Sequence, residues 1–164
     1  MSEQGVAGES TVTLPGEREI HVERIFDASR DRVFAAYTDP ELVSRWWGQR
    51  STTTIVEELD ARTGGMWRFV MRSEDGSEIV FRGVFREVTA PERIVQTFEW
   101  DGMPGHVSVD TATFVDLGDG RTKVISDSIF HTAEERDGMV ESGMESGMNE
   151  TYERLDELLA QQAG

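Results

Sequence analysis

The segment that decides the fold lies near the C-terminus, where residues 140–159 read VESGMESGMNETYERLDELL. Its apolar residues recur every three or four positions, as the buried face of an amphipathic helix requires: Val140, Met144, Met148, Leu155 and Leu158. The pattern predicts one long helix over residues 133–162. Its one-sided polarity implies that another element of the chain covers the apolar stripe.

Within this predicted helix the tetrapeptide Glu-Ser-Gly-Met occurs twice in succession, at residues 141–148. A four-residue step advances slightly more than one helical turn, so Gly143 and Gly147 are expected in one stripe and Met144 and Met148 in its neighbour. Each interior glycine costs about 1 kcal/mol relative to alanine. Two interpretations stay open, namely tight packing on a sheet with methionine as gap-filler, or the lid of a ligand cavity.

The residues before this helix alternate with the period of β-strands. Seven strands are predicted, over residues 18–26, 52–59, 66–72, 78–88, 94–100, 107–116 and 123–130. Between the first two, a short helix is expected after Ser29, an interruption at Asp39-Pro40, and a second short helix that ends at Gly48. Consecutive strands joined by short turns indicate an α+β protein with a curved antiparallel meander.

Composition sets the outer limits on function. The chain has 164 residues, a formal net charge of -16 and no cysteine. Its length predicts a single domain, over residues 17–164, and the Gly, Ser and Glu content of residues 1–16 predicts a flexible tail there. Such acidity argues against nucleic acid and anionic membrane surfaces as partners. The sequence has neither a signal peptide nor an apolar run of about 20 residues, so we expect a cytoplasmic protein that does not insert into membranes.

Candidates for chemistry are few. The histidines His21, His106 and His131 have no metal-binding spacing, so we expect no metal and no cofactor. His106 alone is kept as a candidate, because its loop is expected near a cavity mouth. Glu99 and Asp110 lie on predicted strands, and the favoured interpretation is that they face solvent, with a cavity as the alternative. No nucleophile, Walker or dinucleotide motif is present, so no catalytic residue is assigned.

Three separated segments carry a resemblance to a known family. They are FDASRDRVF at 26–34 with TDPEL at 38–42 and RWWG at 45–48, GVFREV at 83–88 with PERIV at 91–95, and the C-terminal LDELL at 155–159. Together they resemble the SRPBCC (START/Bet v-like) superfamily, in the branch named after the activator of heat-shock-protein-90 ATPase homologue. The resemblance implies a helix-grip fold, in which a curved seven-stranded antiparallel sheet surrounds a long C-terminal helix, with two short helices between strands one and two.

The resemblance also implies a hydrophobic cavity between the sheet and the long helix. We expect the aromatic residues, the Gly/Met stretch and the loop histidine to contribute to it. The candidates for binding a ligand are Trp46, Trp47, Trp67, Phe69, Phe81, Phe98, Trp100, His106, Gly143, Met144, Gly147, Met148 and Tyr152.

Three functions are carried forward. The first is binding of a small lipophilic molecule without covalent chemistry, by a monomer or homodimer. The second is an enzyme of the polyketide aromatase/cyclase type, which would need Asp110, Glu99, His106 or Tyr152 to converge in the cavity. The third is a stress-related protein that acts on a partner through its acidic surface. We expect no regulation of the chaperone, because only 16 residues precede the domain that resembles the activator.

Overall fold

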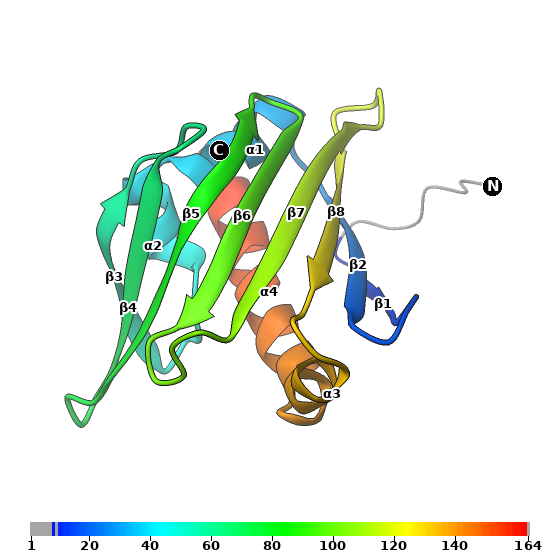
Figure 1. The fold of residues 1–164 in the computed structure, drawn as a ribbon. Coiled ribbons are helices and arrows are strands. Elements are labelled where there is room, and N and C mark those ends of the chain that lie inside the picture. Colours follow the sequence, from blue (N-terminus) through cyan, green and yellow to red (C-terminus); the bar gives the residue numbers. More distant parts are fainter. Residues whose placement is uncertain (1–7, 9, 164) are drawn as a thin grey trace.

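Eight antiparallel strands form one sheet in the computed structural model, which describes residues 8 and 10–163 (Figure 1). Along the sheet the strands follow the order β1-β2-β8-β7-β6-β5-β4-β3. Their bounds are β1 Ser10–Thr13, β2 Glu19–Phe26, β3 Thr52–Leu59, β4 Met66–Ser73, β5 Glu78–Thr89, β6 Arg93–Trp100, β7 Val107–Asp116 and β8 Thr122–Ile129. The α+β helix-grip architecture predicted from the sequence is therefore confirmed.

The strand count differs from the prediction by one. Seven strands lie within a residue or two of their predicted bounds, and β3 and β7 match them. The additional strand, β1, falls in the segment predicted as a flexible tail, and it pairs with β2 from Ser10↔Arg24 to Thr13↔His21. That part of the tail prediction is wrong, because backbone hydrogen bonds to a neighbouring strand hold a short polar segment without any apolar alternation. Residues 1–7 and 9 of the predicted tail lie outside the described residues.

Two short helices follow β2, as predicted: α1 (Arg30–Thr38) and α2 (Pro40–Trp46). Ser29 occupies the N-cap position of α1, although its side chain makes no capping hydrogen bond. Asp39 ends α1 and starts α2, where its carboxylate accepts the Glu41 backbone N–H at 2.9 Å. The chain leaves α2 through Trp47 and turns at Gly48, which has a φ of +99°.

The predicted long C-terminal helix is instead two helices, α3 (Ala133–Glu141) and α4 (Met144–Ala163). The break falls at Ser142-Gly143, where Gly143 has a φ of +86°. Only glycine adopts this conformation at low cost, so Gly143 ends α3 and does not form a stripe with Gly147 on one helix. The expectation of a continuous helix is wrong at this point, because a glycine at this repeat position fits a helix interior and a helix end equally well.

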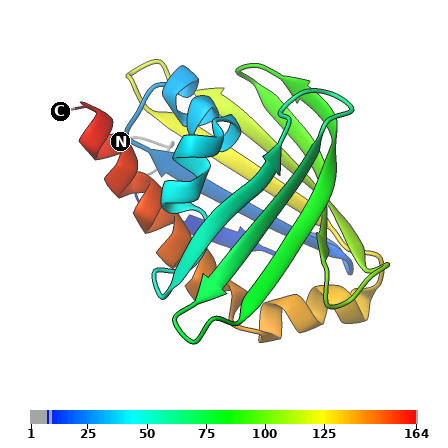
Figure 2. The same cartoon turned by 90° about the vertical axis from the view of Figure 1, so that its left-hand side faces the viewer.

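Helix α4 crosses the concave side of the sheet, and α1 and α2 pack beside its C-terminal half (Figures 1 and 2). Leu155, Leu158 and Leu159 are buried there in one cluster with residues from α1, α2 and the sheet. Arg154 ties the helix to the turn after α2, donating to the carbonyl oxygens of Gly48 at 2.9 Å and Arg45 at 3.0 Å. The C-terminal half of α4 is thus the fixed half of the helix.

The N-terminal half of α4 packs less closely. Met144, Met148 and Tyr152 are half-buried and contact a smaller cluster of Ile20, Val22 and Phe130. None of the helices within residues 8 and 10–163 is both long enough and apolar enough to cross a membrane.

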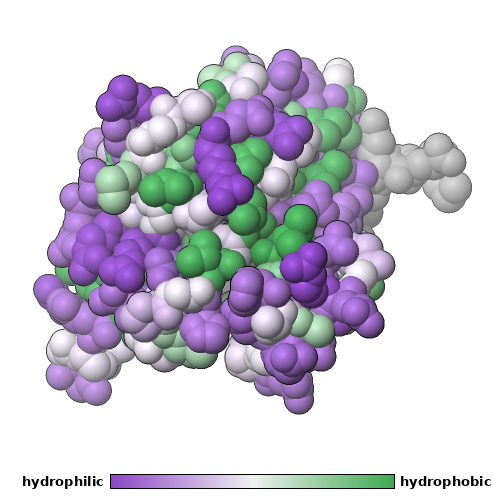
Figure 3. All heavy atoms as spheres, in the orientation of Figure 1, coloured by the Kyte–Doolittle hydropathy of each residue, from purple (hydrophilic) through white to green (hydrophobic). Residues whose placement is uncertain are grey.

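The outer face of the sheet carries charged side chains with apolar patches between them (Figure 3). Met66, Val84 and Trp100 are among the exposed large apolar side chains of the protein. Met66 and Val84 are cross-strand partners on β4 and β5.

The absence of a side chain at Gly83 permits a close approach between β5 and its neighbours. A Cβ at residue 83 would overlap the carbonyl oxygen of Thr97 and lie 2.6 Å from the indole Nε1 of Trp67. That same Nε1 donates to the Thr97 carbonyl at 3.2 Å, so the buried Trp67 depends on the space that Gly83 leaves.

We predict that Gly83→Ala lowers the free energy of unfolding by about 1–3 kcal/mol, because the methyl group overpacks a site bounded by backbone. Urea denaturation followed by tryptophan fluorescence measures the change. The matched control is Gly147→Ala on α4, where the added Cβ would meet only Gln49 Nε2, at 3.6 Å. That variant should gain up to about 1 kcal/mol from helix propensity. Equal stability of Gly83→Ala and the parent would contradict the prediction.

Candidate functional site

A cavity of about 470 Å³ lies between the concave face of the sheet and the helices, partly open to solvent. Strands β2–β8 supply one wall, and α1, α2, α3 and the N-terminal half of α4 supply the other. Its position follows from the packing of α4, since the leucine cluster fills the space under one half of the helix and methionines cover the other.

One side of the cavity is aromatic. Trp47 packs edge-on against Phe69 and Phe81, with ring centroids 5.0 and 5.5 Å apart. Phe98 lies 5.1 Å from Phe81 and 5.8 Å from Trp67. The rings of the strands β4, β5 and β6 point to the same face of the sheet, and Trp47 meets them from the end of α2. The result is a continuous apolar wall that also includes the buried Trp46, whose indole donates to the Ala36 carbonyl at 2.8 Å.

The opposite side is formed by methionines around the α3–α4 break. Met139 lies on α3, and Met144 and Met148 lie on α4. Gly147, also on α4, stands across from the exposed Gln49 that follows α2. Because Gln49 is both exposed and part of the lining, the cavity meets the surface there. Methionine is flexible and polarisable, so this side adapts to the shape of whatever it contacts.

A polar row crosses the floor of the cavity. The strand register places Gln96 of β6 opposite Asp110 of β7, and Asp110 opposite Ser128 of β8. Ser108, two residues before Asp110, donates to Asp110 Oδ1 at 3.3 Å. All four side chains line the cavity. The carboxyl group of Asp110 is therefore surrounded by uncharged hydrogen-bonding groups.

Burial raises the pKa of Asp110 from 3.8 to about 6. Hydrogen bonds from Ser128 and Ser108 act in the other direction, but the loss of water around the carboxylate outweighs them. The interpretation that Asp110 faces solvent is therefore wrong. The available signal was its spacing, because Ser108, Asp110, Ala112 and the buried Phe114 alternate along one face of β7.

Two tyrosines border the polar row. Burial raises the pKa of Tyr152 on α4 and raises that of Tyr37 on α1 well above its usual value. The Tyr37 hydroxyl is buried beside Tyr152, yet within the described residues it has no partner at hydrogen-bonding distance and angle. It is thus a buried polar group within the cavity wall.

Arg24 lies behind Tyr152 and is not part of the lining. Only 3% of its side chain is exposed, and it pairs with Asp156 of α4 at 2.7 Å. Its guanidinium lies 5.4 Å from the centre of the Tyr152 ring. This buried pair holds the middle of α4 against β2 and leaves Asp110 without a cationic partner.

Ten of the thirteen ligand-binding candidates predicted from the sequence lie around this one cavity. They are Trp46, Trp47, Trp67, Phe69, Phe81, Phe98, Met144, Gly147, Met148 and Tyr152. Their part in binding remains a prediction.

The other three candidates lie elsewhere. Trp100 ends β6 and is 43% exposed, with its indole over the Gly102 backbone. His106 pairs with Glu135 at the start of α3, with 3.2 Å between Nδ1 and Oε1. Gly143 forms the exposed break before α4. Glu99 also points away, since its carboxylate accepts the Gly105 backbone N–H at 2.7 Å.

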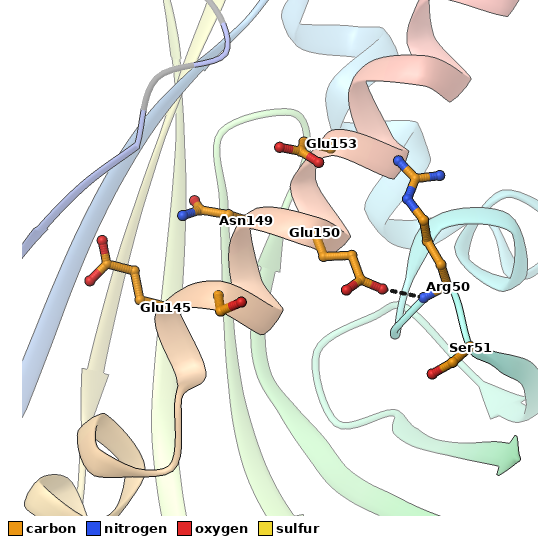
Figure 4. Close-up of a pocket in the computed structure, with 7 residues that line it drawn as sticks. Arg50, Ser51, Glu145, Asn149, Glu150 and Glu153 are labelled. Carbon is orange, nitrogen blue, oxygen red and sulfur yellow. Dashed lines mark hydrogen bonds between the residues drawn. The ribbon is translucent and has the colours of Figure 1, made fainter.

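A second hollow is an open groove on the solvent side of α4 (Figure 4). Arg50 and Ser51 line one side of the groove. The other side is formed by α4, with Glu145, Glu150 and Glu153. The Glu150 carboxylate accepts the Arg50 backbone N–H, and the Arg50 guanidinium pairs with Glu157 at 2.5 Å. Arg50, the one cationic residue that the structure describes in this groove, is thus already paired, and Glu145 and Glu153 are exposed to solvent, so the cavity under α4 is the stronger candidate site. Within the described residues no group of three or more acidic or histidine side chains is arranged to hold a metal ion.

A sheet curved around a C-terminal helix, with a cavity between them, defines a helix-grip protein of the SRPBCC superfamily. The family model described as "Activator of Hsp90 ATPase homolog 1-like protein" matches residues 27–160, and the chain belongs to that family. A search of curated proteins finds no significant match.

Solved structures agree with this assignment. A crystal structure from Rhodobacter sphaeroides covers 93% of this chain and 99% of its own, with 24% identity and a TM-score of 0.88. A solution structure from Arthrobacter aurescens covers 92% and 91%, with 27% identity and a TM-score of 0.83. An HSP90 activator from Plasmodium falciparum covers 79% and 89%, with 19% identity and a TM-score of 0.58, which is a likeness of fold. The family match and these structures together establish the family and the fold of the chain.

We predict that Asp110→Asn changes the pH dependence of stability. The contribution of Asp110 to the free energy of unfolding of the parent should fall as pH rises from 3.8 to about 6, because the folded state holds the Asp110 proton more tightly than the unfolded chain does. The variant lacks this loss and should be more stable than the parent at neutral pH by about 1–3 kcal/mol, with little difference in acid. Urea unfolding at a series of pH values measures it.

The control for this experiment is Glu99→Gln. The Gly105 N–H and Arg82 lower the pKa of Glu99, so its ionised form stabilises the fold and its loss should cost stability at neutral pH. The two variants are thus expected to shift stability in opposite directions. A pH profile of Asp110→Asn that runs parallel to that of the parent would rule out the effect.

Proposed function

We propose that this protein binds a small lipophilic ligand in the cavity between the curved sheet and α4, without covalent chemistry. The observation that carries the proposal is the cavity itself, with its aromatic wall and methionine-rich opposite side. Its volume of about 470 Å³ falls in the range of roughly 300–1,000 Å³ typical of small-molecule sites. A short row of polar groups on an otherwise apolar lining is also typical of such sites, because it orients the ligand.

The packing of α4 supports the same proposal. A folded core of this size fills its interior at high density, and an apolar void costs stability in proportion to its volume. Here the leucines seal one half of the helix while smaller or more flexible residues, Gly147 and Met148, cover the other half. A ligand that fills the space restores the missing contacts on both sides.

We further propose that the binding unit is the single domain of residues 17–164, acting in the cytoplasm as a monomer or homodimer.

A second candidate is catalysis on a bound polyketide-like molecule, of the aromatase/cyclase type. It is favoured by one observation, that Asp110 with its raised pKa and Tyr152 both line the cavity. A carboxyl group with a pKa of about 6 is suited to proton transfer near neutral pH. Of the four groups considered for this chemistry, Glu99 and His106 are not in the lining. The binding function requires fewer groups and is preferred.

We predict that the neutral dye N-phenyl-1-naphthylamine binds with a rise in its fluorescence, and that Ala112→Phe weakens the binding at least about tenfold. Ala112 lies on the cavity floor, so a phenyl group there occupies the space of the ligand. Fluorescence titration gives the dissociation constants. The control is Ala160→Phe on the exposed side of α4, which adds the same group outside the cavity. Binding that is absent, or insensitive to Ala112→Phe in a folded variant, would refute the proposed function.

A further inference from the structure

Among the residues that the structure describes, Asp110 is the only charged one in the lining of the cavity. The other residues around it are apolar, aromatic, or neutral and polar, and none of the arginines, lysines or histidines among the described residues belongs to the lining. Its hydrogen-bonding neighbours are the hydroxyl groups of Ser108 and Ser128, which carry no charge to balance it. Elsewhere in the fold, by contrast, Arg24 shows how a buried charge is compensated, through its pair with Asp156.

We propose that the ligand is a lipophilic amine, whose protonated nitrogen pairs with Asp110 while its apolar body lies against the aromatic wall. This inference rests on the proposed binding function and specifies the chemical class of the ligand. A carboxylate in an apolar site is costly unless it is paired and hydrogen-bonded. An ammonium group supplies both the opposite charge and the donors.

The floor of the cavity has the acceptors that an ammonium group requires. A primary ammonium group has three N–H donors. Asp110 offers its carboxylate oxygens, Gln96 across the β6–β7 pair offers an amide oxygen, and the Ser128 hydroxyl across the β7–β8 pair offers lone pairs. These groups stand in one row across three adjacent strands, so a nitrogen paired with Asp110 has a further acceptor on each side.

The walls also favour a cation with an apolar body. Trp47, Phe81 and Phe98 present ring faces and edges to the cavity, and a cation near an aromatic face is attracted by its quadrupole. The formal net charge of -16 acts in the same sense at long range, because it raises the local concentration of cations and lowers that of anions. Fatty acids and other apolar anions are repelled by the Asp110 carboxylate and by the net negative charge of the protein. A neutral ligand leaves the Asp110 charge buried and unpaired.

The groups that face Asp110 determine how this preference depends on pH. Ser108 shares its strand, Gln96 and Ser128 flank it on β6 and β8, and Tyr152 approaches from α4. Tyr152 is the one other titratable group among them, and burial raises its pKa, so it stays neutral through the acid and neutral range. The pairing is therefore expected to depend on the Asp110 carboxyl alone, and to weaken as the solution becomes more acidic than the pKa of that carboxyl in the complex.

The test compares two probes with the same skeleton, 2-(1-naphthyl)ethylamine and 2-(1-naphthyl)ethanol. Isothermal titration calorimetry at neutral pH measures each dissociation constant for the parent protein, Asp110→Asn and Glu99→Gln. In the parent the amine should bind at least about tenfold more tightly than the alcohol. Asp110→Asn should abolish that preference, because it removes the charge that pairs with the amine and that stays unpaired beside the alcohol. Glu99→Gln removes a carboxylate outside the cavity and should change neither.

A second measurement uses the unaltered protein. Repeating both titrations in increasingly acidic buffer should reduce the preference for the amine, because protonation of the carboxyl group removes the ion pair with the amine and the unpaired charge beside the alcohol. The inference is overturned if the parent binds amine and alcohol equally, or if Asp110→Asn weakens both probes alike. Binding of the alcohol that Ala112→Phe blocks, without preference for the amine, would overturn only the ligand class. Binding of neither probe would overturn the proposed function as well.

Discussion

The structure depends on one packing constraint, which is that α4 is held against the curved sheet along only half its length. Leu155, Leu158 and Leu159 are buried with residues from α1, α2 and several strands, and Arg154 fastens the same half to the carbonyl groups of the turn after α2. This anchor fixes the tilt of the helix. The N-terminal half packs against the sheet less closely, through Met144, Met148 and Tyr152, and the space beside these side chains is the cavity. The position of the candidate site is thus a consequence of where the leucines stop and the methionines begin.

The floor of the cavity works against stability. Asp110, Ser108, Ser128 and Gln96 occupy inward positions of central strands, where apolar side chains would pack better and need no hydrogen-bond partners. Folding pays for this polar row with the burial of the surrounding aromatic and aliphatic side chains. Residues that lower the stability of a core are expected mainly at sites where a protein binds a ligand or catalyses a reaction. The Tyr37 hydroxyl, buried without a hydrogen-bond partner within the described residues, is a further cost at the same place.

Much of the fold was predictable because periodicity is a local property. The alternation in residues 52–59 and 107–116 sets the bounds of β3 and β7, and the strand pairing then follows from short turns. Three features were not predictable from pattern. Residues 10–13 are held by backbone pairing, which leaves no mark in side-chain polarity. Gly143 fits a helix interior or a helix end, and only packing decides between them. Trp100 has the spacing of a cavity residue, but its strand ends there and the indole lies on Gly102.

The aromatic residues of the cavity could be predicted from the alternation along their strands. The prediction that Asp110 faces solvent was wrong. Charged side chains generally prefer solvent, but the alternation of Asp110 with the buried Phe114 places both on the inner face of β7.

The short strand β1 has a consequence for the behaviour of the protein at high concentration. An open sheet has two edges, each with unpaired N–H and C=O groups that can recruit a strand from another molecule. Strand β1 pairs with residues 21–24 of β2 and covers that part of its edge. The outermost strand on this side is therefore β1, a segment of only four residues. The opposite edge, β3, is broken by a register shift between Val56 and Glu58 and carries Glu57 and Glu58. Charge and irregularity are the usual protections of an exposed edge. A protein whose sheet must stay open to hold a cavity is in this way guarded against polymerising through its own strands.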